Sequence, residues 1–315
     1  MSSPKPLIRP RALVPGDLIA VIATSGPVDR DSLDRGLCLL QQRGYRVRLG
    51  ASLLSRAASC NYLAGEDTAR AADFTEMFAD PEVAAVFCAR GGYGAARILR
   101  HVHWPTVAAS PKLFIGYSDV TTLHLALARH AGLVTVHGKM VCGLDGLSER
   151  TADSLWRLIE SAEPPGPIDT GGSDPVELVG GIAEGVTAGG CICLLAHACG
   201  TDYAPDFTNS LVFLEDVGEP VYRVDRDIVQ LIQAANLGAA AGFVIGTVSG
   251  WEAHEAGTGN SLLAVWRELL APLGKPAIYG FPIGHEPEGR AFPIGVRGRL
   301  DAGARTVTLL EPAVI

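Results

Sequence analysis

Three residues of the types that cooperate in nucleophilic catalysis each follow an apolar run of strand-like character: Ser118, Glu215 and His285. A serine hydroxyl needs a histidine that accepts its proton. That histidine needs a carboxylate to hold its tautomer and to stabilise the imidazolium. The chain order serine, glutamate, histidine is one known solution of this problem. The three residues together therefore predict a Ser-Glu-His triad, although each alone has an ordinary structural explanation.

The serine lies at a predicted turn from strand to helix. The apolar run before it ends at Gly116, and apolar residues with helical spacing follow from Asp119 onward. Such a turn exposes the hydroxyl beside the positive end of a helix dipole, where a developing anion is stabilised. The pattern resembles the G-x-S-x-G nucleophile elbow, except that Val120 stands at the second glycine. The alternative is that Ser118 is only a helix N-cap.

A glycine-rich loop at 90–97 follows a buried strand and opens a helix. Arg97 stands where a dinucleotide-binding loop needs its third glycine, so the sequence disfavours a nucleotide cofactor and predicts none. The glycines could instead bring backbone N–H groups close to a reacting carbonyl, as an oxyanion hole requires. A plain tight turn also remains open.

The cysteines and the other histidines give weaker signals. The seven cysteines are odd in number and mostly lie in apolar runs, which favours a reducing, cytoplasmic compartment. Cys191 and Cys193 are separated by one residue rather than the two of a zinc knuckle, so no metal site is predicted. His124, on the predicted helix after Ser118, is expected to pack against the sheet.

Composition excludes several classes of partner. The 315 residues are 48% hydrophobic and 19% charged, with a net charge of −8 and no basic run. Nucleic acid and anionic membranes are therefore poor partners. No apolar stretch reaches the length of a membrane span, and the short run near the N-terminus does not resemble a secretory signal.

The first half of the chain alternates strands with helices. This order predicts an open α/β sheet, in which ligands bind beyond the carboxyl ends of the strands, where Ser118 lies. Predicted strands are 18–23, 45–49, 83–88, 113–117 and 133–136, and predicted helices are 31–42, 67–78, 119–131 and 148–162.

A segment rich in proline and glycine, 166–178, predicts a linker between an N-terminal domain at 1–165 and a C-terminal domain at 179–315. In the second half we expect helices at 189–198, 222–235 and 261–270, strands at 210–214, 241–248 and 277–281, and a closing antiparallel pair at 296–300 and 306–310.

Five short motifs, in order along nearly the whole chain, resemble those of the LD-carboxypeptidase family of serine peptidases, which also contains the microcin C immunity hydrolases. The segments are 89–94 (ARGGYG), 116–119 (GYSD), 214–219 (LEDVGE), 222–226 (YRVDR) and 280–285 (GFPIGH).

The resemblance implies a flavodoxin-like N-terminal domain that carries Ser118 and a swivelling, barrel-like C-terminal domain that carries Glu215 and His285. It implies that the backbone N–H groups of Gly92 and Asp119 form the oxyanion hole. The implied enzyme is a homodimer without metal or cofactor, and its substrate is a small peptide. Such enzymes release the terminal D-alanine of a muropeptide tetrapeptide during cell-wall recycling.

Two departures from the family bear on the substrate. Cys191 stands where the family pattern has asparagine, and the stretch 164–185 contains no aromatic residue. The resemblance implies that microcin immunity members stack aromatic side chains of a longer inter-domain loop on adenine. Hydrolysis of a peptidyl or aminoacyl nucleotide is therefore the less favoured alternative. A catalytically silent peptide-binding protein is a second alternative.

Overall fold

The computed structural model describes residues 7–254 and 259–315. The chain forms two compact units, Met1–Ala162 with Ala313–Ile315, and Glu163–Pro312. We call them the N-terminal and C-terminal units. The last three residues join the N-terminal unit because the Ile315 N–H donates to the Pro10 carbonyl at 2.9 Å and the Ile315 carbonyl accepts from Ala12 at 2.8 Å. Residues 1–6, which precede the first predicted strand, lie outside the described residues.

The N-terminal unit is built on parallel strands in the order β5-β4-β3-β1-β2. This is the strand order of flavodoxin-like folds, so the predicted fold class is confirmed. Every residue of the central strands β1 and β3 is buried, as expected for continuous apolar strands with both faces covered. The strands are β1 Leu18–Ile22, β2 Arg46–Leu49, β3 Val83–Cys88, β4 Leu113–Gly116 and β5 Thr135–His137.

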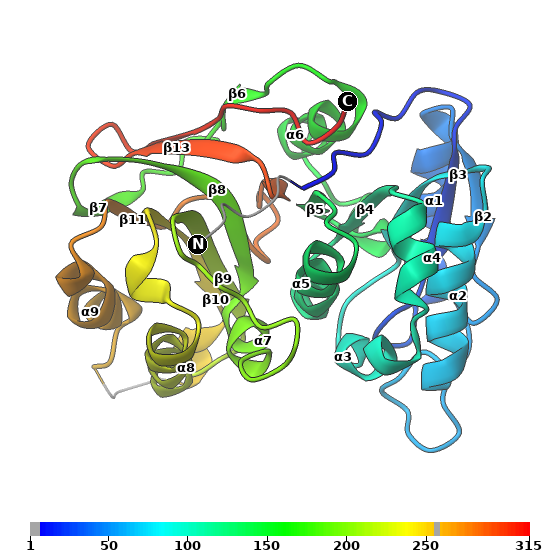
Figure 1. Cartoon of the computed structure of the whole chain (residues 1–315), viewed down its shortest axis with the longest axis horizontal. Helices are drawn as coiled ribbons and strands as arrows, with labels where there is room; N and C mark the ends of the chain where they lie inside the picture. The colour runs from blue at the N-terminus through cyan, green and yellow to red at the C-terminus, as the bar shows by residue number, and fades with distance from the viewer. Residues whose placement is uncertain (1–6, 255–258) are drawn as a thin grey trace. The chain divides into compact units, whose positions relative to one another are not determined.

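Helices surround these strands in Figure 1. The α-helices are α1 Arg30–Gln42, α2 Asp67–Ala79, α3 Ala95–Ile98, α4 Trp104–Ala109, α5 Thr121–His130 and α6 Glu149–Glu160. Short 3-10 helices are η1 Leu99–His101, η2 Ser118–Val120 and η3 Val141–Gly143. The first helix begins where the Asp29 carboxylate accepts from the Ser32 N–H at 2.9 Å, and α6 begins at the N-cap Ser148.

The C-terminal unit contains a mixed eight-stranded sheet in the order β6-β14-β13-β8-β9-β10-β11-β7. Strands β8 to β11 are parallel, and antiparallel strands flank them on both sides. The strands of this sheet are β6 Gly166–Pro167, β7 Val176–Val179, β8 Ile182–Cys191, β9 Ser210–Val217, β10 Gly242–Ser249, β11 Ala277–Tyr279, β13 Arg297–Asp301 and β14 Thr306–Leu309. A further strand, β12 Phe292–Ile294, is not part of this sheet. The predicted closing antiparallel pair is thus confirmed as β13 and β14.

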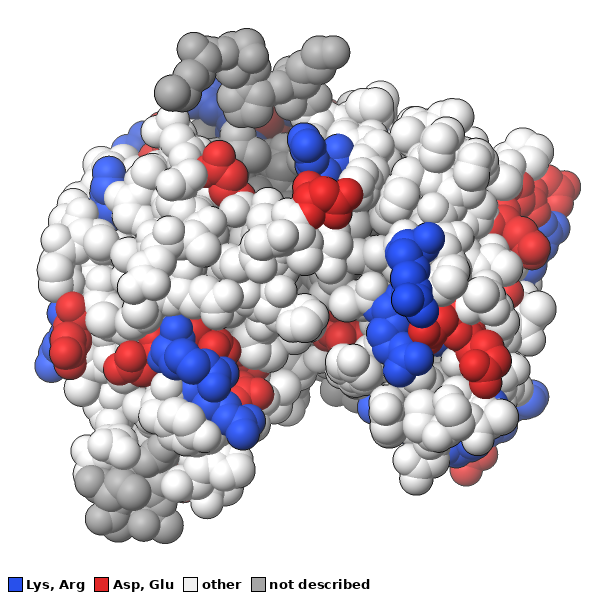
Figure 2. Space-filling model, turned by 60° about the horizontal axis from the view of Figure 1, so that its bottom comes forward, with Lys and Arg blue, Asp and Glu red and all other residues white. Residues whose placement is uncertain are grey.

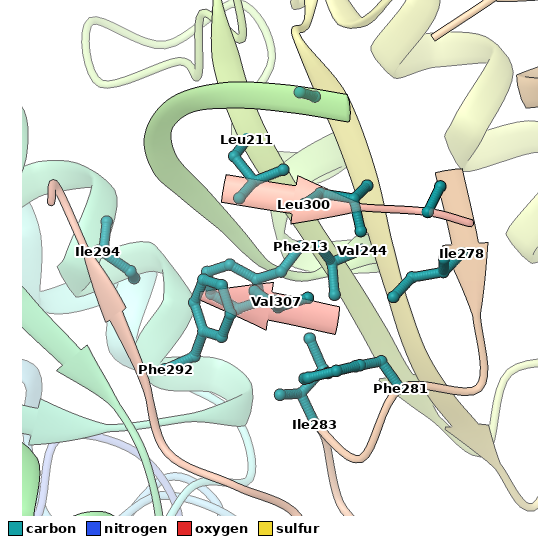
Figure 3. Packing of buried hydrophobic residues seen from close by; sticks show 12 residues of the cluster. Leu211, Phe213, Val244, Ile278, Phe281, Ile283, Phe292, Ile294, Leu300 and Val307 are labelled. Atoms are coloured by element: carbon teal, nitrogen blue, oxygen red, sulfur yellow. The ribbon is translucent and has the colours of Figure 1, made fainter. Parts of the chain in front are cut away.

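One apolar cluster fills the C-terminal unit (Figure 3). Leu300 and Val307 from β13 and β14 pack in the same cluster as Ile278 from β11, although these strands lie far apart in the sheet order. The sheet must therefore curl around its core, which is the barrel-like form expected for this domain. Phe213 and Phe292 contact each other within the cluster, with ring centroids 4.5 Å apart and ring planes tilted by 43°.

The helices of the C-terminal unit are α7 Ile192–His197, α8 Val221–Ala234 and α9 Leu262–Val265. Shorter turns are η4 Leu237–Ala239, η5 Trp251–His254, the π-helical η6 Trp266–Leu270 and η7 Ala271–Leu273. The predicted helix over 261–270 is therefore present as α9 continued by a π-helical turn.

The predicted helix over 189–198 is wrong in its first part, because residues 189–191 extend β8. A side chain at Gly189 would overlap the carbonyl oxygen of Phe213 on the neighbouring strand, so glycine permits the close pairing of β8 with β9. Small apolar residues alone cannot distinguish such a strand from a buried helix. The helix itself, α7, begins at Ile192.

The region predicted as a linker, 166–178, contributes β6 and the start of β7 to the edges of the C-terminal sheet. The N-terminal unit ends at Ala162, whereas the predicted N-terminal domain ended three residues later, at 165. Among the described residues, every helix is too short or too polar to cross a bilayer. On the face drawn in Figure 2, Lys and Arg side chains lie next to Asp and Glu side chains.

Candidate active site

Ser118 lies at the sharp turn that joins β4 to α5. Its φ is 64°, in the left-handed region that non-glycine residues rarely adopt. The N-caps of η2 and α5 are Tyr117 and Val120, so Ser118 caps neither helix. A strained serine at the carboxyl end of a parallel strand is the conformation of a nucleophile elbow. The structure therefore favours a chemical role for this residue over the N-cap alternative.

Two glycines make room for this turn. A Cβ at Gly116 would lie 2.6 Å from Cγ1 of Val120, which is fully buried. Val120, which stands at the second glycine of the elbow pattern, fits because Gly116 has no side chain. A Cβ at Gly91 would lie 3.0 Å from the Ser118 Cβ and 3.2 Å from its Oγ. The glycine-rich loop after β3 therefore runs directly against the serine side chain.

The same loop is tied to the serine turn by Asp119. This carboxylate is buried, and its Oδ2 accepts from the Ala95 N–H, at the start of α3, at 2.8 Å. Gly92 lies in this loop, between Gly91, which faces Ser118, and Ala95, which donates to Asp119; its φ is 115°. Both residues predicted for the oxyanion hole, Gly92 and Asp119, thus lie in segments adjacent to Ser118, and their role stays a prediction.

Arg70 is a supporting residue that the sequence analysis missed. Its fully buried guanidinium donates to the carbonyls of Thr24, Gly94 (3.0 Å) and Gly65 (3.3 Å) and pairs with Asp67 at 2.5 Å. It therefore joins the loops that follow β1 and β3. The available signal was an arginine on the apolar face of a predicted helix, where a buried charge requires several partners.

His124 holds the strand end that precedes the serine. It is buried, and its Nε2 lies 2.9 Å from the Gly116 carbonyl while its Nδ1 lies 2.9 Å from Thr135 Oγ1. Burial lowers the pKa of His124 to about 4, so the ring is neutral at pH 7. Nε2–H donates to the carbonyl, and Nδ1 accepts from the Thr135 hydroxyl. The prediction that His124 packs against the sheet is confirmed.

Glu215 and His285 form the second half of the candidate site, in the C-terminal unit. The distance between Glu215 Oε2 and His285 Nδ1 is 2.6 Å. Glu215 is fully buried near the end of β9, and the His285 side chain, in the loop after β11, is 14% exposed. An ionised carboxylate can only accept, so Nδ1 donates and Nε2 is the proton acceptor of the ring. This is the orientation that a triad requires of its base.

Glycine at position 284 permits this contact. Its φ is 124°, and a Cβ there would lie 2.9 Å from Thr247 Oγ1 and 3.1 Å from both Cβ and Oε2 of Glu215. The neighbouring Ile283 carbonyl accepts from the Thr247 N–H at 3.0 Å, which holds the loop on β10. The histidine must therefore follow a glycine if its ring is to reach the buried glutamate.

Asp216, the next residue, has a different environment. Its Oδ2 accepts from the Cys193 N–H at 2.8 Å, and its Oδ1 accepts from the Val217 N–H at 2.8 Å and lies 3.3 Å from Cys191 Sγ. Burial raises the pKa of Asp216 to about 6, against the hydrogen bonds that lower it. Successive strand residues point to opposite faces, so only Glu215 is directed at the histidine.

An open pocket of about 310 Å³ lies at the carboxyl ends of the strands in the N-terminal unit. Its charged residues are Arg56, Arg90 and Asp29, and Asn61 adds an amide. Arg90 belongs to the glycine-rich loop, where its Nε donates to the Gly91 carbonyl at 3.2 Å. Two guanidinium groups and one carboxylate leave the pocket with net positive charge next to the loop that contacts Ser118.

The predicted residues are distributed over both units. Ser118, Gly92 and Asp119 belong to the N-terminal unit, and Glu215 and His285 belong to the C-terminal unit. The structure brings the glutamate and the histidine together, as predicted. The pairing of Ser118 with His285 stays a prediction.

Two family models match the chain. Residues 19–138 match the model of the LD-carboxypeptidase N-terminal domain, and residues 184–300 match that of the LD-carboxypeptidase C-terminal domain. A protein of Streptomyces coelicolor is 40% identical over 98% of this chain and 98% of its own length. The murein tetrapeptide carboxypeptidase of Pseudomonas aeruginosa is 34% identical over 88% of this chain and 91% of its own length.

Two solved structures resemble the chain over nearly its whole length. The muramoyltetrapeptide carboxypeptidase from Oxalobacter formigenes has a TM-score of 0.78 at 30% identity, covering 93% of this chain and 97% of its own. The microcin C7 self immunity protein MccF has a TM-score of 0.87 at 20% identity, covering 98% of this chain and 100% of its own. At that identity the second likeness is one of fold alone.

Proposed function

Because the chain belongs to the LD-carboxypeptidase family, we propose that it is a serine carboxypeptidase that cleaves an L,D peptide bond through an acyl-enzyme. The observation that carries the proposal is the turn at Ser118, whose φ of 64° is a backbone conformation typical of a nucleophile elbow. The pairing of Glu215 with His285 at 2.6 Å supports it.

In the proposed mechanism, Ser118 Oγ attacks the carbonyl carbon of the scissile bond while His285 Nε2 accepts the hydroxyl proton. Glu215 stabilises the imidazolium that forms. The tetrahedral oxyanion accepts hydrogen bonds from the backbone N–H groups of Gly92 and Asp119, each contributing a factor of roughly 10² to 10³ in rate.

Collapse of this intermediate breaks the C–N bond. The imidazolium of His285 gives its proton to the leaving amine, which departs as the free amino acid, and the acyl group stays on Ser118 as an ester. Water then attacks the ester, and the same histidine accepts the proton of the water. The second collapse returns the proton to Ser118 and releases the shortened peptide with a new carboxylate.

We propose a muropeptide tetrapeptide as the substrate and its terminal D-alanine as the leaving group. The names of the relatives from Pseudomonas aeruginosa and Oxalobacter formigenes support this substrate class. A carboxypeptidase must recognise a terminal carboxylate, and Arg56 and Arg90 offer guanidinium groups for it in one pocket. We also propose that the enzyme is a homodimer and that it acts in the cytoplasm during cell-wall recycling.

The second candidate function is hydrolysis of a peptidyl or aminoacyl nucleotide, which the shared fold with MccF brings into consideration. It is less favoured because residues 164–185 lack an aromatic side chain that could stack on a base. A third candidate is a silent peptide-binding protein. It would bind a tetrapeptide without turnover and without covalent labelling.

Incubation with a muropeptide tetrapeptide and mass detection of released D-alanine tests the proposal. A parallel reaction with an acyl-sulfamoyl adenylate tests the second candidate. Release of D-alanine by the wild type, with none from Ser118→Ala, is the expected outcome. Labelling by a fluorophosphonate should map to Ser118, and Ser59→Ala, at an exposed serine, is the matched control. Cleavage of only the adenylate, or of neither compound, would refute the proposed activity.

A further inference from the structure

Three side chains with metal-binding atoms converge in the C-terminal unit where β8 ends and α7 begins. They are Cys191 from the end of β8, Cys193 from the first turn of α7, and Asp216 from β9. The two sulfur atoms lie 3.5 Å apart. Asp216 Oδ1 lies 3.3 Å from Cys191 Sγ and 3.6 Å from Cys193 Sγ.

We propose that Cys191, Cys193 and Asp216 form a binding site for a thiophilic divalent cation, with Zn²⁺ as its natural occupant and a fourth position open to water. A tetrahedral zinc ion with bonds of about 2.3 Å to sulfur and about 2.0 Å to oxygen separates two sulfurs by about 3.8 Å and a sulfur from an oxygen by about 3.5 Å. The three observed separations, 3.5, 3.3 and 3.6 Å, each lie within a few tenths of an ångström of these values. Small side-chain rotations would therefore complete the site.

The carboxylate is already oriented for this role. Asp216 Oδ2 accepts from the Cys193 N–H at 2.8 Å, and Oδ1 accepts from the Val217 N–H at 2.8 Å. Metal ligands held by such outer hydrogen bonds lose little freedom on binding. Because Asp216 and Cys191 are buried while Cys193 is partly exposed, a cation can enter at Cys193 and lose most of its water inside.

The spacing C-x-C alone does not indicate this site, which is why the sequence analysis predicted none. The third ligand comes from the adjacent strand. In the parallel register Cys191 lies opposite Glu215, so the next residue, Asp216, lies beside the start of α7. On binding, each thiol gives its proton to solvent, so two thiolates and one carboxylate surround the dication and the occupied site keeps a net charge of −1.

Metal titration of the reduced, full-length protein tests the site. Co²⁺ is the spectroscopic probe, and Zn²⁺ should displace it. We expect one cobalt per chain, with a thiolate-to-cobalt charge-transfer band and tetrahedral d–d bands. Cys191→Asn and Cys193→Ser should lose the band and weaken binding at least by the roughly 10- to 100-fold that loss of a supporting group costs. Cys199→Ser is the matched control, because that thiol contacts the Leu195 carbonyl at 3.7 Å instead.

Absence of a thiolate–cobalt band in the reduced wild type would overturn the site, as would an equal effect of Cys199→Ser. The site would also be overturned if an oxidant formed a Cys191–Cys193 disulfide while the reduced protein bound no metal. Melting curves of each variant without metal separate loss of binding from loss of folding. The metal site does not depend on the proposed function, so metal binding by a protein that is inactive on every peptide would refute only the proposed function.

Discussion

A buried histidine next to the candidate nucleophile should make folding stability depend on pH. His124 is neutral in the folded protein because burial lowers its pKa to about 4. In the unfolded chain its pKa returns to about 6.5. Between these values the unfolded state binds more protons than the folded state, so the free energy of unfolding falls as pH decreases.

The size of the effect follows from the two pKa values. A difference of about 2.5 pKa units corresponds to about 3 kcal/mol, lost completely once pH is below about 4. Between pH 7.5 and pH 5 the loss should be about 2 kcal/mol. His124→Gln removes this term, and its side-chain amide can still donate to the Gly116 carbonyl, which the histidine contacts at 2.9 Å.

Urea unfolding of the wild type and of His124→Gln, measured at intervals from pH 4.5 to 7.5, tests this prediction. The difference between their free energies of unfolding should shrink by about 2 kcal/mol as pH falls to 5. His103→Gln is the matched control, because it makes the same substitution at an exposed histidine instead of a buried one. Parallel curves for wild type and His124→Gln would refute the reasoning.

Four further predictions concern the candidate site. Ser118→Ala should lower kcat by roughly 10⁴-fold or more without unfolding the protein, and wild-type turnover in a D-alanine release assay would contradict its role. Glu215→Gln should lower kcat by about 10⁴-fold, since the 2.6 Å contact with His285 then no longer stabilises the imidazolium; an unchanged pH–rate profile would count against it. Gly91→Ala places a methyl 3.0 Å from the Ser118 Cβ and should lower kcat by about 10²-fold, whereas Gly146→Ala, whose Cβ would meet nothing within 4 Å, should have no effect. Arg56→Gln should raise KM for a peptide with a free terminal carboxylate and not for its amide, and equal KM changes for both peptides would show that Arg56 does not bind the carboxylate.

Much of the N-terminal unit could be predicted because its signals are local. Continuous apolar runs such as the one that forms β3 indicate strands buried on both faces, and their alternation with helices indicates a parallel sheet. The serine turn was predictable for the same reason, since glycine, serine and the following helix are neighbours in sequence. The left-handed backbone of Ser118 was not, because strain at a non-glycine residue is imposed by its surroundings.

The C-terminal unit was harder to predict. Gly189 and its neighbours have the composition of a buried helix, yet they extend β8 because the contact with Phe213 on β9 requires glycine. The attachment of Ile315 to the N-terminal unit likewise depends on hydrogen bonds to Pro10 and Ala12, about three hundred positions away in sequence. Neither contact leaves a local trace.

The sequence by itself determined which residue types are available for catalysis and in which order they occur. It also indicated that Ser118, Glu215 and His285 each follow an apolar run of strand-like character, because such runs and the residues after them are neighbours in the sequence. Only the tertiary structure decided how Gly284 lets the histidine reach Glu215, that Arg70 joins two loops, and that two cysteines share a carboxylate. The physical reason is that strand register and side-chain direction set these contacts. Both depend on pairing between segments far apart in the chain.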